Sequence, residues 1–237
     1  MTKEGSKPTE GAKPRDEVDG RSRRWEAHRA RRQDEFLEAA VAAVEEEGPG
    51  VGIRRIAERI GVPRSAVYRH FRDRADLDEL IRKRALDSLM AELAPTLEPD
   101  GTVVEAIRRS VDAYLGWIEE HPRLHAFLGH DALSPAGDSP TVAGTKAEIA
   151  HRTGKLFQSV LRSVGRDTGL ALSLAFGLVG FVDATVNNWL ADKGDKPSST
   201  ELAEFLARSI WSVLDGNLRA LGTELDPHRP MSELLGD

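Results

Sequence analysis

The segment from Ile53 to Phe71 constrains the fold of this chain more than any other part of the sequence. Apolar residues in its first half have the spacing of one helical face, and its second half repeats that pattern. Between the halves, Gly61 suits the left-handed conformation that ends a helix, and Pro63 suits the first turn of the next one. The apolar positions are Ile53, Ile56, Ala57, Ile60, Val67 and Phe71. The segment therefore predicts two short helices joined by a tight turn.

The second short helix carries polar residues on the side opposite its apolar face. With the apolar residues turned inward, four side chains face outward together. They are Arg64, Ser65, Tyr68 and Arg69. Such a face can enter the major groove of DNA, where an arginine donates two hydrogen bonds to guanine. The alternative is a helical hairpin whose basic face is only solvated.

Charge is distributed unevenly along the 237 residues, whose net charge is −6. Residues 1–90 contain 20 Lys+Arg and 18 Asp+Glu, so 13 and 21 remain for residues 91–237. Within residues 52–74 there are seven arginines and only two acidic residues. A basic module on an acidic body is compatible with binding to nucleic acid, although the chain as a whole is acidic.

These positions together resemble the signature of the TetR (tetracycline-repressor-like) family of transcriptional regulators. The resemblance covers about residues 31–81 and rests on the run Ile56-Ala57-x-x-x-Gly61-Val62-x-x-Ser65-x-Val67-Tyr68-x-His70-Phe71, continued to Arg74-x-x-Leu77. Gly52 stands where the family usually has a capping Ser or Thr, and Arg74 stands where it usually has lysine. The resemblance implies an all-α protein with an N-terminal three-helix DNA-binding head and a larger C-terminal helical domain for ligand binding and dimerisation.

By this resemblance, seven residues form the DNA-binding site: Arg54, Arg64, Ser65, Tyr68, Arg69, His70 and Arg74. Arg64, Ser65 and Tyr68 would face bases, and Arg54 would reach a base or a phosphate. Tyr68, His70 and Arg74 would hold the phosphate backbone. Arg64 is the leading specificity residue, because one bidentate contact to guanine gives about 1–3 kcal/mol of discrimination between bases.

Helical periodicity continues through the rest of the chain, with no convincing strand pattern. Helices are expected at about residues 75–93, 102–121, 141–164, 168–191 and 199–221. Thr102 with Glu105 and Ser198 with Glu201 form Ser/Thr-x-x-Glu capping boxes at two helix starts. Gly48 is expected to end the first helix of the head.

Four segments are expected from composition, from the helical pattern and from what the resemblance implies. Residues 1–22 form a polar extension that we expect to be disordered, and residues 23–74 form the helix-turn-helix head. Residues 75–225 form the ligand-binding and dimerisation domain, and residues 226–237 form a C-terminal tail. Six arginines between residues 21 and 32 are equally consistent with a solvated helix start and with an arm against the DNA backbone.

The resemblance also implies how the body works. The segments 168–191 and 199–221 would pair with their copies in a homodimer, and the two-fold axis would match a palindromic operator. A small, largely apolar effector would bind between the head and these helices and release the repressor from DNA by shifting the helix at 75–93. The expected ligand-binding residues are Trp117, Phe127, Phe157, Phe176, Phe181 and Asn187, although aromatic residues at helical spacing are more often core.

Other classes of protein are disfavoured by the sequence. There is no cysteine for a disulfide or a thiolate metal site, and the N-terminus does not look like a signal sequence, so we expect a cytoplasmic protein. Asp183 ends the longest apolar stretch too early for a membrane span. No cofactor is expected, and no hydrolase motif such as Gly-x-Ser-x-Gly is present.

The alternative function is a helical metal-binding or hydrolytic enzyme. His121 and His125 are four residues apart and could share a helical face, with His130 and Asp131 following. Pro122 lies between the two histidines and more readily marks a helix junction, which would break that face. The sequence therefore favours a regulator that is not an enzyme and has no metal site.

Overall fold

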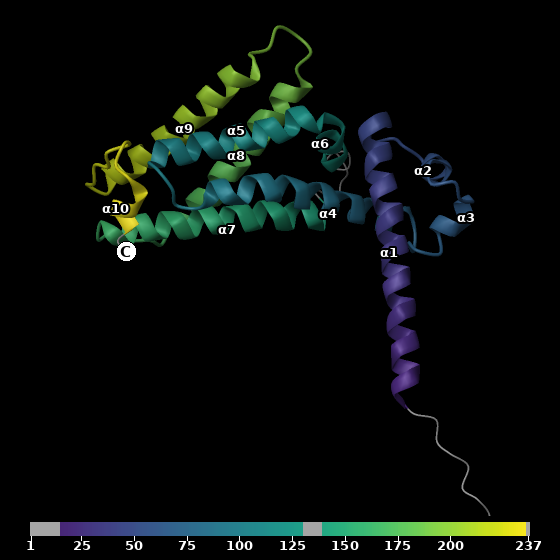
Figure 1. Cartoon of the computed structure of the whole chain (residues 1–237). Coiled ribbons are helices and arrows are strands. Elements are labelled where there is room, and N and C mark those ends of the chain that lie inside the picture. The colour runs from purple at the N-terminus through teal and green to yellow at the C-terminus, as the bar shows by residue number, and fades with distance from the viewer. Residues whose placement is uncertain (1–14, 130–138, 236–237) are drawn as a thin grey trace, which may run out of the picture.

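The computed structural model of the chain describes the backbone of residues 15–129 and 139–235, and the side chains of residues 28–129 and 139–235. Over these ranges the protein is all-α, as expected, and contains no strand (Figure 1). Its elements are α1 (Arg15–Glu47), α2 (Ile53–Arg59), α3 (Arg64–Val67), α4 (Arg74–Leu93), the 3-10 helix η1 (Ala94–Leu97), α5 (Val103–Glu120), α6 (Pro122–Leu128), α7 (Pro140–Ser163), α8 (Ala171–Ala191), α9 (Ser199–Ala220) and α10 (Met231–Leu235).

The N-terminal head consists of α1, α2 and α3. The helix α1 runs across one end of the body, and α2 and α3 lie on its far side (Figure 1). The apolar residues that the sequence pattern singles out form its core, with Ile56, Ala57, Val67 and Phe71 buried. Gly48, at φ +92°, ends the first helix as expected.

The C-terminal body is a bundle of longer helices. In it, α4 packs against α5, α6 and α7, while α7 packs along α8 and α5 packs against α9. Because α4 also packs against α1, it joins the core of the head to the core of the body. Any displacement of α4 therefore acts on both parts.

Helix ends in the body follow the expected local chemistry. Both predicted capping boxes are present, at Thr102 with Glu105 and at Ser198 with Glu201. Accepting backbone and side-chain hydrogen bonds lowers the pKa of both glutamates. The five helices expected after the head all exist, with bounds within three residues of those predicted.

Both ends of the chain differ from the expectation. The helix α1 begins at Arg15, inside the extension expected to be disordered up to residue 22, while residues 1–14 lie outside the described residues. Once a buried part nucleates a helix, each further residue adds one hydrogen bond, and the Arg- and Glu-rich sequence propagates helix well. The tail expected at 226–237 contains α10, whose Met231 and Leu234 are buried.

One helix of the body, α8, is apolar on sides that this chain does not cover. By length and composition it could cross a membrane, and only 22% of its most apolar 18-residue window is buried. Its uncovered residues include Leu170 just before it, 79% exposed, and Phe176, 43% exposed. On α9, Phe205 and Val213 are exposed as well, and so is Leu221 directly after it. A Cβ atom added at Gly177 or Gly180 would meet nothing within 4 Å, so these glycines also face open space.

Candidate nucleic-acid interface and internal cavity

The turn between α2 and α3 is formed by backbone hydrogen bonds and one left-handed glycine. Gly61 has a φ of +66°, and its N–H donates to the carbonyl of Glu58 at 3.1 Å. The N–H of Val62 donates to the carbonyl of Ala57 at 3.0 Å. Pro63 has extended backbone and precedes the first residue of α3. The chain is thereby redirected from α2 into α3, as the Gly-Val-Pro run predicts.

The inner side of α3 is anchored in the core of the head. Val67 and Phe71 are only 1% and 2% exposed. The ring of Phe71 meets that of Phe36 on α1 edge to face, with centroids 6.3 Å apart. Because these two side chains fix the rotation of α3 about its axis, they also determine which residues face solvent.

The outer side of α3 and of the turn after it carries the four residues that the sequence predicts to face outward. Arg64, Ser65, Tyr68 and Arg69 are all exposed, and Tyr68 retains 41% of its accessible surface. The guanidinium of Arg64 donates to the Tyr68 hydroxyl at 3.0 Å and lies 5.5 Å from the centre of its ring. Arginine and tyrosine are therefore held together on one protruding face.

Other arginines of residues 52–74 differ in how strongly they are paired with carboxylates of the same chain. Arg54 is 85% exposed, and its guanidinium lies 3.6 Å from the carboxylate of Glu58. Arg55 donates to Glu47 at 2.5 Å, and Arg59 donates to both carboxylate oxygens of Glu46, one of them at 2.6 Å. The latter hydrogen bonds lower the pKa of Glu46. Arg55 and Arg59 thus tie α2 to the C-terminal end of α1.

Two predicted DNA-binding residues lie in a different setting from the exposed face. His70 is half-buried with its ring 4.7 Å from that of Phe36, and burial, reinforced by Arg29, Arg69 and Arg32, lowers its pKa. Arg74, at the start of α4, donates to Asp78 at 2.8 Å and to the carbonyl of Val51 at 2.7 Å. The Arg74 guanidinium therefore connects α4 to the loop before α2.

Comparison with known proteins agrees with this geometry. The sequence pattern of bacterial regulatory proteins of the tetR family matches residues 36–94, which include α2, the turn and α3. The chain is 28% identical over 207 residues to an uncharacterized HTH-type transcriptional regulator of Mycobacterium tuberculosis, covering 87% of each protein. It is 24% identical over 192 residues to the HTH-type transcriptional activator FasR of Mycolicibacterium smegmatis, covering 78% of this chain and 84% of that one.

The whole fold has a counterpart among solved structures. A tetR-family transcriptional regulator from Streptomyces coelicolor superposes with a TM-score of 0.64 at 20% identity, over 87% of both chains. Head and body are therefore arranged as in that protein. Residues 36–94 thus match the tetR family, and the relatives that align with most of the chain are HTH-type transcriptional regulators. Together these findings support a DNA-binding transcriptional regulator of the TetR family, with an N-terminal helix-turn-helix domain and a C-terminal helical domain.

The body of the protein contains a partly open cavity of about 610 Å³. Side chains from α4, α5, α6, α7 and α8 line most of it, and Ile210, Leu214 and Met231 contribute from α9 and α10. The lining is mainly leucine, isoleucine and valine, so the interior favours apolar molecules.

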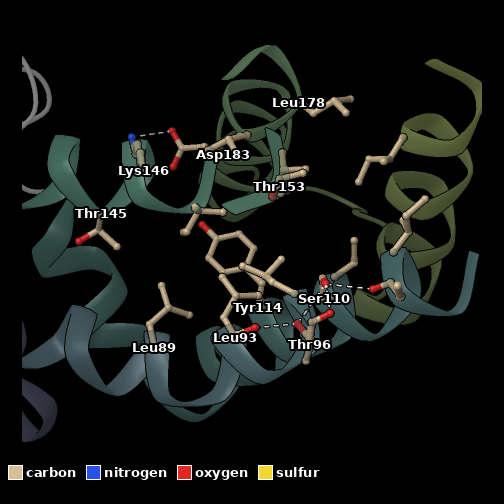
Figure 2. Close-up of a pocket in the computed structure, with 18 of the residues that line it drawn as sticks. Leu89, Leu93, Thr96, Ser110, Tyr114, Thr145, Lys146, Thr153, Leu178 and Asp183 are labelled. Atoms are coloured by element: carbon tan, nitrogen blue, oxygen red, sulfur yellow. Dashed lines mark hydrogen bonds and ion pairs between the residues drawn. The ribbon is translucent and has the colours of Figure 1, made fainter. Parts of the chain in front are cut away.

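A few polar groups gather at the part of the cavity nearest α6. Lys146 on α7 forms an ion pair with Asp183 on α8 at 2.9 Å, and the Tyr114 hydroxyl from α5 points toward that side of the cavity (Figure 2). The same hydroxyl lies 3.4 Å from Nε2 of His125 on α6. Burial raises the pKa of Tyr114, with the charge of Asp183 adding to the effect, and burial lowers the pKa of His125.

The expected ligand residues divide into two groups. Phe157 and Asn187 line the cavity. The other four are elsewhere: Trp117 is buried and donates to Ser88 at 3.2 Å, Phe127 is buried under the Arg82 guanidinium, Phe176 is on the outer surface, and Phe181 lies near Phe205. Their helical phase turns them into the core or outward, so the structure does not bring them together around one cavity.

Sequence reasoning missed the main polar residues of the cavity. Tyr114, His125, Lys146 and Asp183 come from four different helices. One signal was available, because Asp183 interrupts the most apolar helix of the chain and a charge there needs a partner. The sequence does not say which residue supplies that partner.

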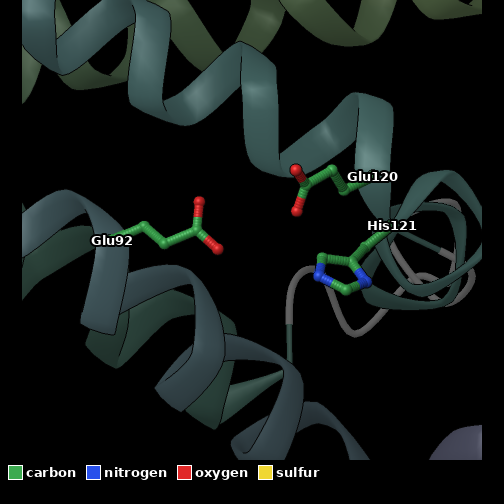
Figure 3. Close-up of side chains that lie close together, drawn as sticks. All are labelled: Glu92, Glu120 and His121. Carbon is green, nitrogen blue, oxygen red and sulfur yellow. The ribbon is translucent and has the colours of Figure 1, made fainter.

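The structure also separates the two histidines of the alternative metal site. His121 Nδ1 lies 2.5 Å from a carboxylate oxygen of Glu45 on α1, whereas His125 lines the cavity. His130 and Asp131 lie outside the described residues. In the described part of the chain, His121 instead lies near Glu92 and Glu120, with potential ligand atoms within 4.8 Å of one another (Figure 3). Both carboxylates are exposed to solvent. Exposed acidic groups commonly lie this close together without holding a metal ion.

Proposed function

We propose that this regulator is a homodimeric repressor that binds a palindromic operator through α3 and is released by a small, mainly apolar effector. The observation that carries the proposal is the exposed face of α3, where a buried core holds Arg64, Ser65, Tyr68 and Arg69 outward. The cavity and the uncovered faces of α8 and α9 support the effector and the dimer. Metal-dependent or hydrolytic catalysis is not favoured, and we place the protein in the cytoplasm.

In this proposal Arg64, Ser65 and Tyr68 contact base edges. Arg54 and Arg69 contact phosphate or nearby base edges, because both are exposed beside the same face. Phosphate contacts determine register and salt dependence, whereas base contacts determine specificity. His70 and Arg74 act at the rim of the site. Their contacts with Phe36, Asp78 and Val51 favour a role in positioning the head over a direct grip on phosphate.

Dimerisation through α8 and α9 would cover the apolar surface that one chain leaves exposed. Uncovered apolar patches of this kind commonly mark protein–protein interfaces. Gly177 and Gly180 would allow the backbones of two α8 helices to approach closely. A two-fold axis through this interface would place two copies of α3 on successive major grooves of one duplex.

Two connections between cavity and head support release by an effector. On α4, Leu86, Leu89 and Leu93 line the cavity, and the same helix packs against α1. On α6, His125 and Leu128 line the cavity while Arg123 donates to the carbonyls of Glu45 and Glu46 at the end of α1. A ligand that displaces α4 or α6 would change the orientation of the head. A coupling of about 1–3 kcal/mol, or 5–150-fold in affinity, suffices for a switch.

Operator binding can be tested with fragments selected from the source genome. We expect the purified protein to enrich a pseudo-palindromic sequence and to bind it as one dimer in fluorescence anisotropy and light scattering. A reporter gene placed behind that sequence should be repressed. A reporter that is activated would overturn the repressor assignment, and enrichment of no sequence would overturn the operator assignment.

The dimer interface has a matched pair of surface variants. Val213→Lys places a charge on the exposed apolar face of α9, so we expect a monomer with weakened operator binding. Ala143→Lys places the same charge on the exposed side of α7 and should leave the dimer intact. If Val213→Lys remains dimeric and binds as the parent protein does, α9 is not in the interface.

A further inference from the structure

The dimensions of the cavity indicate an elongated ligand. On α5 the lining runs from Val103 to Tyr114, about 16 Å along the helix at 1.5 Å per residue. On the adjoining wall, α4 and η1 contribute residues from Leu86 to Leu97. One end lies against α6, near the head, and the other lies against α10. A chain-like molecule would fill this space along the bundle axis better than a compact one.

Two hydroxyls in the middle of the cavity, those of Thr96 and Ser110, are already satisfied within the protein. The Thr96 hydroxyl donates to the carbonyl of Leu93 at 2.8 Å, and the Ser110 hydroxyl donates to the carbonyl of Ala106 at 2.9 Å. The two hydroxyls also lie 3.0 Å apart (Figure 2). Because they already bond within the protein, this stretch of wall behaves toward a ligand as largely apolar. Apart from the Thr153 hydroxyl, the main polar groups that face the cavity lie at the α6 end.

The α6 end carries no net charge. Lys146 and Asp183 neutralise each other across 2.9 Å. Burial lowers the pKa of His125 and raises that of Tyr114, so the imidazole and the phenol are both neutral near pH 7. An anionic or cationic head group would therefore be buried without a counter-charge, which is unfavourable. A hydroxyl, ester or amide can instead hydrogen-bond with the Tyr114–His125 pair.

The far end is closed by the C-terminal segment. Met231, the first residue of α10, is 1% exposed and its N–H donates to the carbonyl of Gly101 at 2.8 Å. A second hollow of about 210 Å³ shares lining residues with the main cavity. The shared residues are Val103, Leu156, Phe157, Leu214 and Met231. Methionine is flexible, so the Met231 side chain is suited to set how far a ligand extends toward the second hollow.

We propose that the cavity binds an uncharged, long-chain amphiphile, with its hydrogen-bonding head beside the Tyr114–His125 pair and its apolar end against Met231. This assignment rests on the proposed effector function and specifies the chemistry of its ligand. The Tyr114 hydroxyl recognises the head group, and the Met231 side chain limits the length of the apolar part.

Three probes that share one alkyl chain and differ in head group test whether the ligand is uncharged. Dodecan-1-ol, dodecanoate and dodecylammonium are titrated into the full-length protein below their aggregation concentrations, with calorimetry as the readout. We expect the alcohol to bind at least ten-fold more tightly than either ion. Equal or tighter binding of an ion, or no binding of the alcohol, overturns the proposal.

The chain contains only two tyrosines, which supply a matched pair of variants. Tyr114→Phe should weaken dodecan-1-ol binding about three- to ten-fold, the effect of one lost hydrogen bond. Tyr68→Phe removes the same hydroxyl from the exposed face of α3 and should leave alcohol binding unchanged. Thermal unfolding without probe checks that both variants are folded. Equal alcohol affinity in the Tyr114→Phe and parent proteins overturns the head-group assignment.

The length of the alkyl chain of the alcohol tests the role of Met231 at the α10 end of the cavity. Across decan-1-ol, dodecan-1-ol and tetradecan-1-ol, Met231→Ala should shift the tightest binding toward a longer alcohol, and an unchanged optimum overturns the role of Met231. Operator binding is measured separately in the same samples. If the alcohol binds as expected but the operator is not released, the proposed switch fails while the ligand assignment stands.

Discussion

The exposed face of α3 and the cavity of the body are built in opposite ways. The face lies between residues 64 and 69, so α3 and the turn directly after it bring its four side chains together. The polar end of the cavity takes residues from four helices spread between positions 114 and 183. The face is rigid because it stands on a packed core, whereas the cavity wall borders a hollow. We therefore expect substitutions in the core under α3 to disturb the exposed face, whereas substitutions in the cavity wall change the shape of the cavity and leave the fold intact.

The largest expected difference between the two regions is in stability. Phe71→Ala removes a ring from the packed core under α3 and should lower the free energy of unfolding by about 3–5 kcal/mol. Phe157→Ala removes a ring that borders an existing hollow, so fewer contacts are lost and the decrease should be smaller. Chemical denaturation followed by circular dichroism measures both. Equal losses would contradict the distinction between a packed support and a loose wall.

The next largest effect concerns sequence recognition by the exposed face. Arg64→Ala should remove about 1–3 kcal/mol of discrimination at one base pair of the operator, because a bidentate contact to guanine is lost. Arg108→Ala, on the exposed side of α5 beside Asp112, is the matched control and should not change recognition. Anisotropy against a panel of single-base operator variants measures discrimination. An unchanged preference in Arg64→Ala would remove that residue from the base-reading set.

What the sequence could and could not predict follows from the same contrast. The turn at Gly61, the inward side of α3 and the capping boxes were predictable, because each depends on residues within one or two turns of each other. The ion pair of Lys146 with Asp183 was not, because helix packing alone decides which faces of α7 and α8 meet. Phe176 and Phe181 show the same limit, since aromatic character does not reveal whether a ring faces a cavity, the core or solvent.

In the head, the number of arginines in the sequence likewise did not show which of them are exposed. Seven arginines between residues 52 and 74 correctly marked a basic region, but the number alone did not separate structural from exposed residues. Arg55 and Arg59 are paired with acids of α1, and Arg74 is paired with Asp78. The packing of α1 against α2 partly neutralises Arg55 and Arg59, whereas Arg72 and Arg74 pair with acids four residues later in the chain. We therefore favour Arg54, Arg64 and Arg69 as the arginines that contact DNA.

A smaller effect concerns Arg74, which either positions the head or contacts a DNA phosphate. Arg74→Ala should lower the free energy of unfolding by about 1 kcal/mol, because a partly buried charged hydrogen bond to the carbonyl of Val51 is lost. If Arg74 only positions the head, the slope of the logarithm of the operator-binding constant against the logarithm of salt concentration is unchanged. A slope reduced by about one would instead indicate a phosphate contact. Arg72→Ala, whose 86%-exposed side chain pairs with Asp76, is the neighbouring control.

The smallest effect is a pH dependence that compares one histidine from each region. Burial lowers the pKa of both His70 and His125, so each binds a proton more readily in the unfolded chain. Their contribution to stability is therefore complete above about pH 6.5 and declines as the pH falls from there toward the folded pKa. His125→Asn and His70→Asn should each reduce the loss of stability between about pH 8 and about pH 5.

Added salt separates the two histidines, because their charged neighbours differ. Burial is the main cause at both sites, but three arginines reinforce it at His70, whereas Asp183 and Lys146 act in opposite directions at His125. Salt screens the partly exposed arginines. Titration by NMR should therefore show the pKa of His70 rising with ionic strength while that of His125 stays in place. Equal shifts at both would mean that the charged face around α3 does not reach His70, and that the two regions differ less in electrostatics than in packing.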